Sequence, residues 1–120
     1  MKPQIEKVRF GSIVVGGETL THDVLIRLNG KVKKRKKKLS KEKYGTSHLL
    51  SLEEAEHIYQ EGAERLIVGS GKFGLVKLTD EAAAYFAERG CRVDLLPTRK
   101  AAAAWNEARG AVLGLFHITC

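Results

Sequence analysis

An apolar strand runs directly into a glycine-rich loop in the stretch Leu66-Ile67-Val68-Gly69-Ser70-Gly71-Lys72-Phe73-Gly74. The strand is expected over Arg65–Val68, and its continuous apolar character is typical of a strand buried on both faces of a sheet. The residues after the loop predict helix, strand, helix and strand in turn. This order, starting from the first strand, indicates an α/β layer with right-handed crossovers.

The helices and strands after the loop are bounded by recognisable stop and start signals. Thr79 and Thr98 are each expected to cap a helix, and Gly90 and Gly110 to end one. Pro97 ends the strand before the last helix. The expected elements are a helix over Asp80–Arg89, a strand over Arg92–Leu96, a helix after Thr98 that buries Ala101, Ala104, Trp105 and Ala108, and a strand over Ala111–Thr119.

The N-terminal half predicts an antiparallel lead-in. Asn29-Gly30 is a dipeptide that favours a tight hairpin turn with positive φ at both positions. Leu39–Leu50 has no clear period and is expected to be an irregular connection, and Ser51-Leu52-Glu53-Glu54 has the pattern of a capping box at a helix start. The expected strands are Ile5–Phe10, Ser12–Gly16, Thr21–Leu28 and an edge strand over Lys31–Lys37.

Length and composition bound the class of protein. A chain of 120 residues with 43% hydrophobic and 29% charged residues is expected to form one domain, residues 1–120, around one core. No apolar run approaches the roughly 20 residues that cross a bilayer. The first ten residues lack the apolar core of a signal peptide, so no membrane association and a cytoplasmic location are expected.

The net charge of +7 is concentrated in one segment. Residues 31–43 hold nine Lys or Arg and one Glu, which leaves the rest of the chain at −1. Two interpretations are open: polyanion or nucleic-acid binding, which is driven by counterion release, and a solvated edge strand whose charge prevents aggregation. No aromatic residues interleave with the lysines for base stacking, which favours the second. The core of the segment is Lys33-Lys34-Arg35-Lys36-Lys37-Lys38.

The glycine loop is the candidate ligand pocket. Ligands of α/β sheets bind beyond the carboxyl ends of the strands, so the loop and the Pro97-Thr98 turn should share one edge. Gly69, Gly71 and Gly74 have the spacing of a dinucleotide-binding loop, but residues 75–78 separate them from the helix at Thr79. A tight structural turn and a site for a small polar or anionic ligand both remain open. The candidate residues are Gly69, Ser70, Gly71, Lys72, Thr98 and His48.

The sequence predicts no catalytic residues, no metal site and no cofactor. His48 could act as a base or a hydrogen-bonding group, and His117 lies in an apolar strand where a structural role is expected. Cys91 and Cys120 lack Cys/His ligand spacing, so a structural zinc site is not expected. If their strands run antiparallel, the two cysteines could form a disulfide; two free thiols are the alternative.

Six short stretches occur in order over almost the whole chain: Arg9-Phe10-Gly11, Gly45-Thr46-Ser47-His48, Leu66-Ile67-Val68-Gly69-Ser70-Gly71, Leu96-Pro97-Thr98, Trp105-Asn106 and Leu115-Phe116-His117-Ile118-Thr119-Cys120. Together they resemble the small domain family typified by the adipogenesis-associated domain protein and mitochondrial complex I assembly factor 3. The resemblance implies a three-layer α/β fold with a central mixed sheet, an undefined molecular activity and, from the mitochondrial relative, a role in binding other proteins.

The chain departs from the eukaryotic members of that family in two places. Trp105 stands where relatives more often carry Tyr, and the Lys/Arg run replaces a less charged segment. We interpret the chain as a prokaryotic, archaeal-type member. The expected function is a binding or assembly module that has a protein partner or self-associates, rather than an enzyme. The alternatives are a small-ligand or anion site at Gly69–Gly74, which could be enzymatic, and polyanion binding through residues 31–43.

Overall fold

The computed structural model describes residues 2–120. Its largest sheet has five strands in the order β5-β4-β10-β7-β9. Strands β7, β9 and β10 are parallel, whereas β4 is antiparallel to β10 and β5 is antiparallel to β4. The predicted mixed central sheet is therefore confirmed. Its strands are β4 (Val24–Ile26), β5 (Val32–Lys34), β7 (Arg65–Ser70), β9 (Arg92–Leu96) and β10 (Val112–His117).

The N-terminal strands form a separate antiparallel sheet. Its order is β1-β2-β3, with β1 over Ile5–Arg9, β2 over Ser12–Val15 and β3 over Glu18–Leu20. A two-stranded parallel sheet pairs β6 (Leu49–Leu50) with β8 (Lys77–Leu78). The helices are α1 (Lys38–Tyr44), α2 (Leu52–Ile58), α3 (Asp80–Glu88) and α4 (Thr98–Glu107).

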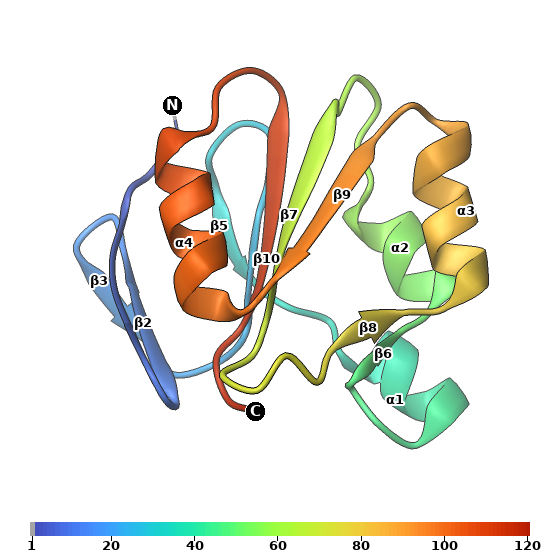
Figure 1. Cartoon of the computed structure of the whole chain (residues 1–120), viewed down its shortest axis with the longest axis horizontal. Helices are drawn as coiled ribbons and strands as arrows, with labels where there is room; N and C mark the ends of the chain where they lie inside the picture. The colour runs from blue at the N-terminus through green and yellow to red at the C-terminus, as the bar shows by residue number, and fades with distance from the viewer. Residues whose placement is uncertain (1) are drawn as a thin grey trace.

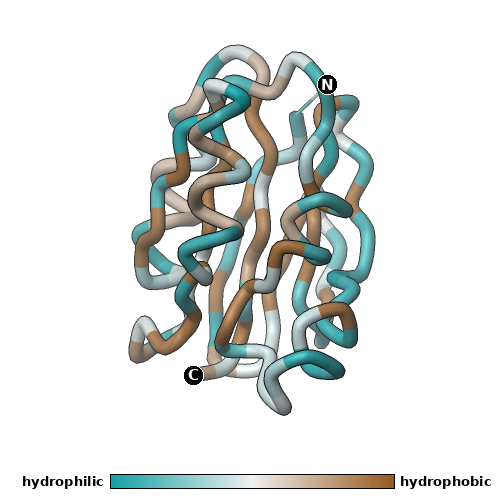
Figure 2. The backbone as a smooth tube through the Cα atoms, turned by 90° about the vertical axis from the view of Figure 1, so that its right-hand side faces the viewer, coloured by the Kyte–Doolittle hydropathy of each residue, from teal (hydrophilic) through white to brown (hydrophobic). Residues whose placement is uncertain are grey.

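Figure 1 shows α4 and the N-terminal sheet on one side of the central strands, and α2 and α3 on the other. Because strand side chains alternate between faces, β10 contributes to two separate cores. Val112 and Phe116 pack toward α4, whereas Leu113 and Leu115 pack toward α2 and α3. All six residues of β10 are buried. In Figure 2 the hydrophobic residues follow the central strands and the hydrophilic residues lie mainly outside them.

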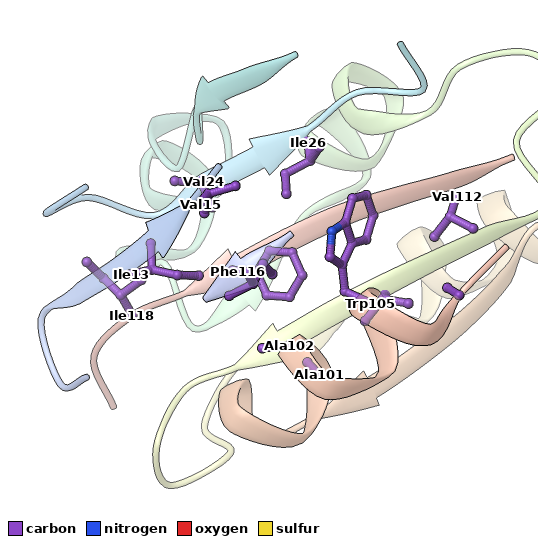
Figure 3. Packing of buried hydrophobic residues seen from close by; sticks show 13 residues of the cluster. Ile13, Val15, Val24, Ile26, Ala101, Ala102, Trp105, Val112, Phe116 and Ile118 are labelled. Carbon is purple, nitrogen blue, oxygen red and sulfur yellow. The ribbon is translucent and has the colours of Figure 1, made fainter. Parts of the chain in front are cut away.

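Trp105 organises the core on the α4 side. It is fully buried, and its ring meets Phe116 edge-on at 6.0 Å between centroids (Figure 3). Its Nε1–H donates to the Pro3 carbonyl oxygen at 2.8 Å, and Asn106 bonds both backbone groups of Ile5. Gly114 makes room for the indole, because a Cβ there would lie 3.0 Å from Trp105 and 2.7 Å from Phe116. The Trp105-Asn106 pair thus attaches the N-terminal sheet to α4.

The segment over Leu39–Leu50 is not irregular, contrary to expectation. It contains α1 and β6, and α1 ends at Gly45, whose φ of +72° is left-handed. An apolar period was missing because α1 buries only Ser40. The hairpin turn before β5 also differs, since only Gly30 has positive φ and the strands stop at Ile26 and resume at Val32.

The expected capping box at Ser51 forms only in part, and the expected Thr98 cap is wrong. Ser51 accepts the Glu54 N–H at 3.1 Å, as the capping box predicts, but the Glu54 carboxylate turns away from Ser51 and bonds Arg35. Thr98 is the first residue of α4 and makes no capping hydrogen bond; Pro97 occupies the cap position. Thr79 caps α3 as predicted, accepting from the Ala82 N–H at 3.1 Å.

Within residues 2–120, none of the helices combines the length and the apolar character needed to cross a membrane.

Candidate functional site

The carboxyl ends of β7, β9 and β10 meet at one edge of the sheet, and Thr98 joins them. Its Oγ1 accepts the Gly71 N–H at 2.8 Å and donates to the His117 carbonyl oxygen at 2.6 Å. The Thr98 N–H in turn donates to the Gly71 carbonyl oxygen at 3.3 Å. The glycine loop and the Pro97-Thr98 turn therefore share an edge, as the topology rule predicts.

The glycine loop itself is closed by the C-terminal segment. Gly71 has a φ of +98°, and a Cβ on it would lie 2.4 Å from the Cys120 carbonyl carbon. The Lys72 N–H donates to the Thr119 carbonyl oxygen at 2.8 Å, and the Leu75 N–H donates to the Cys120 carbonyl oxygen at 3.4 Å. These amides are engaged within the chain, so the loop does not form an open phosphate cradle of the dinucleotide-binding kind.

A pocket of about 220 Å³ lies beside the loop, on the α4 side of the sheet. Thr98 and Lys72 line it, whereas Gly69, Ser70 and Gly71 are buried behind it and shape the turn. Its walls combine apolar surface with four cationic side chains and hold no carboxylate. The lining residues are Val8, Arg9, Phe10, Lys72, Pro97, Thr98, Arg99, Lys100, Ile118 and Thr119.

The charges around this pocket are available to a ligand. Within residues 2–120, no ion pair involves Arg9, Lys72, Arg99 or Lys100. All four residues are exposed. Arg99 and Lys100 belong to the first turn of α4, where the helix dipole adds partial positive charge. The electrostatics of the pocket therefore favour an anion.

His48 does not line this pocket. Its Nε2 lies 3.7 Å from Cys120 Sγ, and its ring meets the His117 ring at 5.5 Å between centroids. By strand alternation the His117 side chain points to the face opposite Ile118, which does line the pocket. His48 was predicted to line one ligand pocket together with the glycine loop. In the structure Lys72 and Thr98 line the pocket, whereas His48 lies beside Cys120 and His117.

A buried ionic network lies behind the two histidines, and sequence reasoning missed it. Arg35 donates from Nε and Nη2 to the two oxygens of Glu54 at 2.6 and 3.0 Å, and from Nη1 to Asp23 Oδ2 at 3.0 Å. Asp23 Oδ2 also lies 2.7 Å from His117 Nδ1, and Asp23 Oδ1 accepts the Ile118 N–H at 3.0 Å. The side chains of Arg35, Glu54 and Asp23 are 1–4% exposed.

The network favours the charged forms of Asp23 and Arg35. Burial by itself would raise the pKa of Asp23, but the hydrogen bonds from His117 and Ile118 and the charge of Arg35 outweigh it, so this pKa lies below its ordinary value. Burial opposes the charge on Arg35, yet its contacts with Glu54 and Asp23 hold its pKa above the ordinary value. The signal in the sequence is the one arginine inside a run of lysines, since bidentate pairing with a carboxylate requires a guanidinium.

The basic segment is therefore not uniformly solvated. Lys33 and Lys34 are exposed on β5, Lys36 and Lys37 in the connection after it, and Lys38 at the start of α1. The predicted edge strand over Lys31–Lys37 is thus shorter than expected, because β5 ends at Lys34. Arg35 is the exception and must be removed from the proposed polyanion surface. An open hollow of about 320 Å³ lies beside β5, lined by Leu25, Arg27, Lys33, Lys34, Lys36 and His57.

The two cysteines are free thiols and form no disulfide. Cys91 immediately precedes β9, and Cys120 follows β10. Both strands are parallel to β7, so the two residues lie at opposite edges of the sheet. The antiparallel arrangement that a bridge would require is absent.

Several solved structures share this fold. A conserved hypothetical protein from Pyrococcus horikoshii OT3 is 34% identical, with a TM-score of 0.89 over 98% of this chain and 99% of that one. A protein solved under the name MT938 is 32% identical, with a TM-score of 0.83 over 99% and 100% of the two chains. A Bordetella pertussis protein described as a Mth938-like domain shares the fold at 16% identity, with a TM-score of 0.63 over 97% and 85%.

Among curated protein sequences there is no match. The profile of a family described as protein of unknown function (DUF498/DUF598) matches residues 5–115, which run from the start of β1 into β10. This match covers nearly the whole described fold. The chain therefore belongs to the DUF498/DUF598 family.

Proposed function

We propose that the protein is a binding module that holds a small organic anion in the pocket at the carboxyl edge of the sheet. One observation carries the proposal: four cations, Arg9, Lys72, Arg99 and Lys100, surround an apolar pocket that no carboxylate lines. A ligand with an apolar body and a phosphate, sulfonate or carboxylate group matches both parts of this surface.

The residues around the pocket support binding rather than turnover. Two threonines line it, and both hydroxyls are engaged within the chain. Thr98 Oγ1 accepts from the Gly71 N–H and donates to the His117 carbonyl oxygen, and Thr119 Oγ1 lies 3.1 Å from His117 Nε2. A nucleophile would need a base within hydrogen-bond reach, and neither histidine of the adjoining cluster lines the pocket. The pocket residues can thus supply charge and shape to a ligand.

The proposal can be tested with 1-anilinonaphthalene-8-sulfonate, a fluorescent sulfonate with an apolar body. Saturable binding of this probe, displaced by organic phosphates or carboxylates and not by their neutral analogues, is expected. The double variant Lys72→Ala/Arg99→Ala should weaken binding about 10-fold or more, since each charge-assisted hydrogen bond contributes about 1.5–3 kcal/mol.

The matched control is Lys33→Ala/Lys34→Ala, which removes the same charge from exposed positions on β5. It should leave binding of the sulfonate within about twofold of the unmodified protein, apart from weak long-range screening. Equal losses in the two double variants would reduce the effect to net charge and refute a specific pocket. So would probe binding that organic anions fail to displace.

Polyanion binding through residues 31–43 is a second candidate, favoured by the hollow that Arg27, Lys33, Lys34 and Lys36 line. A labelled single-stranded oligonucleotide distinguishes the two candidates with the same proteins. Polyanion binding requires that Lys33→Ala/Lys34→Ala weakens the complex at physiological salt while Lys72→Ala/Arg99→Ala does not. Binding that vanishes at physiological salt would leave β5 as a charged edge strand.

A further inference from the structure

Three side chains with nitrogen or sulfur ligand atoms converge on the face of the sheet opposite the anion pocket. His48 precedes β6, His117 ends β10, and Cys120 follows it. One ring nitrogen of each histidine and the Cys120 sulfur all lie within 4.8 Å of one another. His48 and Cys120 are 72 residues apart, so no short ligand spacing marks this cluster in the sequence.

The geometry is close to that of a metal site. With metal–nitrogen distances of about 2.0–2.1 Å and a metal–sulfur distance of about 2.3 Å, the ligand atoms of a tetrahedral zinc site lie roughly 3.3–3.6 Å apart. His48 Nε2 and Cys120 Sγ are already at 3.7 Å. The remaining separations need to shorten by about 1 Å, and His48 and Cys120 are only partly buried and can rotate.

The orientation of His117 is set by a carboxylate behind it. His117 is 4% exposed, and its Nδ1 lies 2.7 Å from Asp23 Oδ2, so Nδ1–H is the donor to that carboxylate. The lone pair is then on Nε2, where the Thr119 hydroxyl lies at 3.1 Å and can donate to it. A carboxylate on the far nitrogen of a ligating histidine is the usual outer shell of a metal site.

The backbone holds the other two ligands in place. The Lys77 N–H donates to the His48 carbonyl oxygen at 2.8 Å, and the Arg35 guanidinium bonds the neighbouring Ser47 carbonyl oxygen at 2.9 Å. The C-terminal segment is fixed by the glycine loop, where only Gly71 leaves room for the Cys120 backbone. The three residues therefore belong to an anchored arrangement.

We propose that His48, His117 Nε2 and Cys120 Sγ bind one Zn²⁺ ion, with a fourth position open to water or an exogenous ligand. Two imidazoles and a thiolate suit zinc and discriminate against Mg²⁺ and Ca²⁺, which prefer oxygen ligands. On binding, Cys120 loses its thiol proton to solvent as the Zn–S bond forms, and the Thr119 hydroxyl gives up its hydrogen bond to Nε2.

Cobalt(II) is the probe that tests this site, because it occupies zinc sites and reports thiolate ligation by absorption. The full chain, freed of any histidine tag and kept reduced with a non-thiol reductant, should bind one Co²⁺. A thiolate-to-cobalt charge-transfer band in the near ultraviolet and intense visible bands of four-coordinate cobalt are expected. Zn²⁺ should displace the cobalt and abolish both.

Variants assign the ligands. Cys120→Ser should lose the charge-transfer band, and His48→Gln should weaken cobalt binding at least about 10-fold, while Trp105 fluorescence shows that both remain folded. His57→Gln and Cys91→Ser are the controls, because each removes a residue of the same type outside the cluster. They should bind cobalt as the unmodified protein does.

A charge-transfer band that survives in Cys120→Ser and disappears in Cys91→Ser would assign the metal elsewhere and overturn the proposal. A folded, reduced protein that shows no charge-transfer band at saturating Co²⁺ would overturn it as well. The anion pocket and the metal site use different side chains, so the failure of one leaves the other to be judged on its own assay.

Discussion

Replacing Arg35 with Met should greatly lower the free energy of unfolding, although Arg35 lies inside a run of exposed lysines. The guanidinium is 1% exposed and makes four hydrogen bonds, three of them to the carboxylates of Asp23 and Glu54 and one to the Ser47 carbonyl oxygen. Its removal leaves two buried carboxylates without their cation. Breaking a buried ion pair by removing one partner costs about 3–5 kcal/mol.

The assay is urea unfolding followed by the fluorescence of Trp105, the one tryptophan of the chain, which is fully buried. A loss of about 3–5 kcal/mol in the free energy of unfolding would also appear in a thermal melt, as a melting temperature lowered by roughly 10–20 °C for a domain of this size. The matched control is Lys34→Met, which removes the neighbouring charge from an exposed position. It should change the free energy of unfolding by less than about 0.5 kcal/mol.

The pH dependence supplies a second check. Because the pKa of Asp23 is lowered in the folded state, its charge stabilises the fold above its unfolded pKa of about 3.9, and this contribution is lost as pH falls through the lower folded value. Without Arg35 the folded pKa of Asp23 should rise. The loss of unfolding free energy in Arg35→Met, relative to the unmodified protein, should therefore be largest near neutral pH and shrink on acidification. A deficit below about 1 kcal/mol, or one equal to that of Lys34→Met, would refute the reasoning.

Three further outcomes are expected from the contacts at the sheet edge. Gly71→Ala should destabilise the fold in urea unfolding and weaken cobalt binding at least about 10-fold, because a Cβ at this position displaces Cys120. The control Gly62→Ala has a φ of +90° and no atom within 4 Å of the new Cβ, so it should show only the backbone strain of about 1–3 kcal/mol. Equal effects of the two variants on stability and on cobalt binding would contradict this. Thr98→Val should cost about 1–3 kcal/mol in urea unfolding, since the Gly71 N–H loses its acceptor, while the exposed Thr19→Val should cost little. In the metal-free protein, Ellman's reagent should modify Cys120 before Cys91, because burial raises the pKa of the Cys91 thiol. Faster modification of Cys91 would contradict this, since it would mean that the thiol is accessible at the start of β9.

Much of the fold follows from local sequence patterns. The strands predicted over Arg65–Val68 and Ala111–Thr119 are β7 (Arg65–Ser70) and β10 (Val112–His117), and Thr79 caps α3 as its position predicts. These features depend on burial and on backbone preferences that act over a few residues. Where burial is polar, the pattern fails: α1 contributes one buried residue, Ser40, whose hydroxyl bonds the Glu54 carboxylate, so no apolar period marks the helix.

The candidate sites divide in the same way. Lys72 and Thr98 could be placed together from topology, because parallel strands end at a common edge. The roles of Arg35, Asp23 and His117 could not, since they depend on partners in other elements. Arg35 bonds side chains 12 and 19 residues away, and Asp23 and His117 meet across 94 residues. His48 belongs with Cys120 for the same reason, although the glycine loop that makes room for Cys120 is visible in the sequence.

The sequence by itself determined the alternation of strands and helices after residue 65 and the edge where ligands are expected, because hydrophobic periodicity and turn residues act locally. The mixed central sheet was implied by the family resemblance and is confirmed by the strand pairing. Only the tertiary structure decided that Arg35 is buried among exposed lysines and that Cys91 and Cys120 lie at opposite edges of the sheet. It also decided that His48 and His117 meet Cys120. Those outcomes depend on long-range contacts, in which a charge is buried only where distant partners satisfy it.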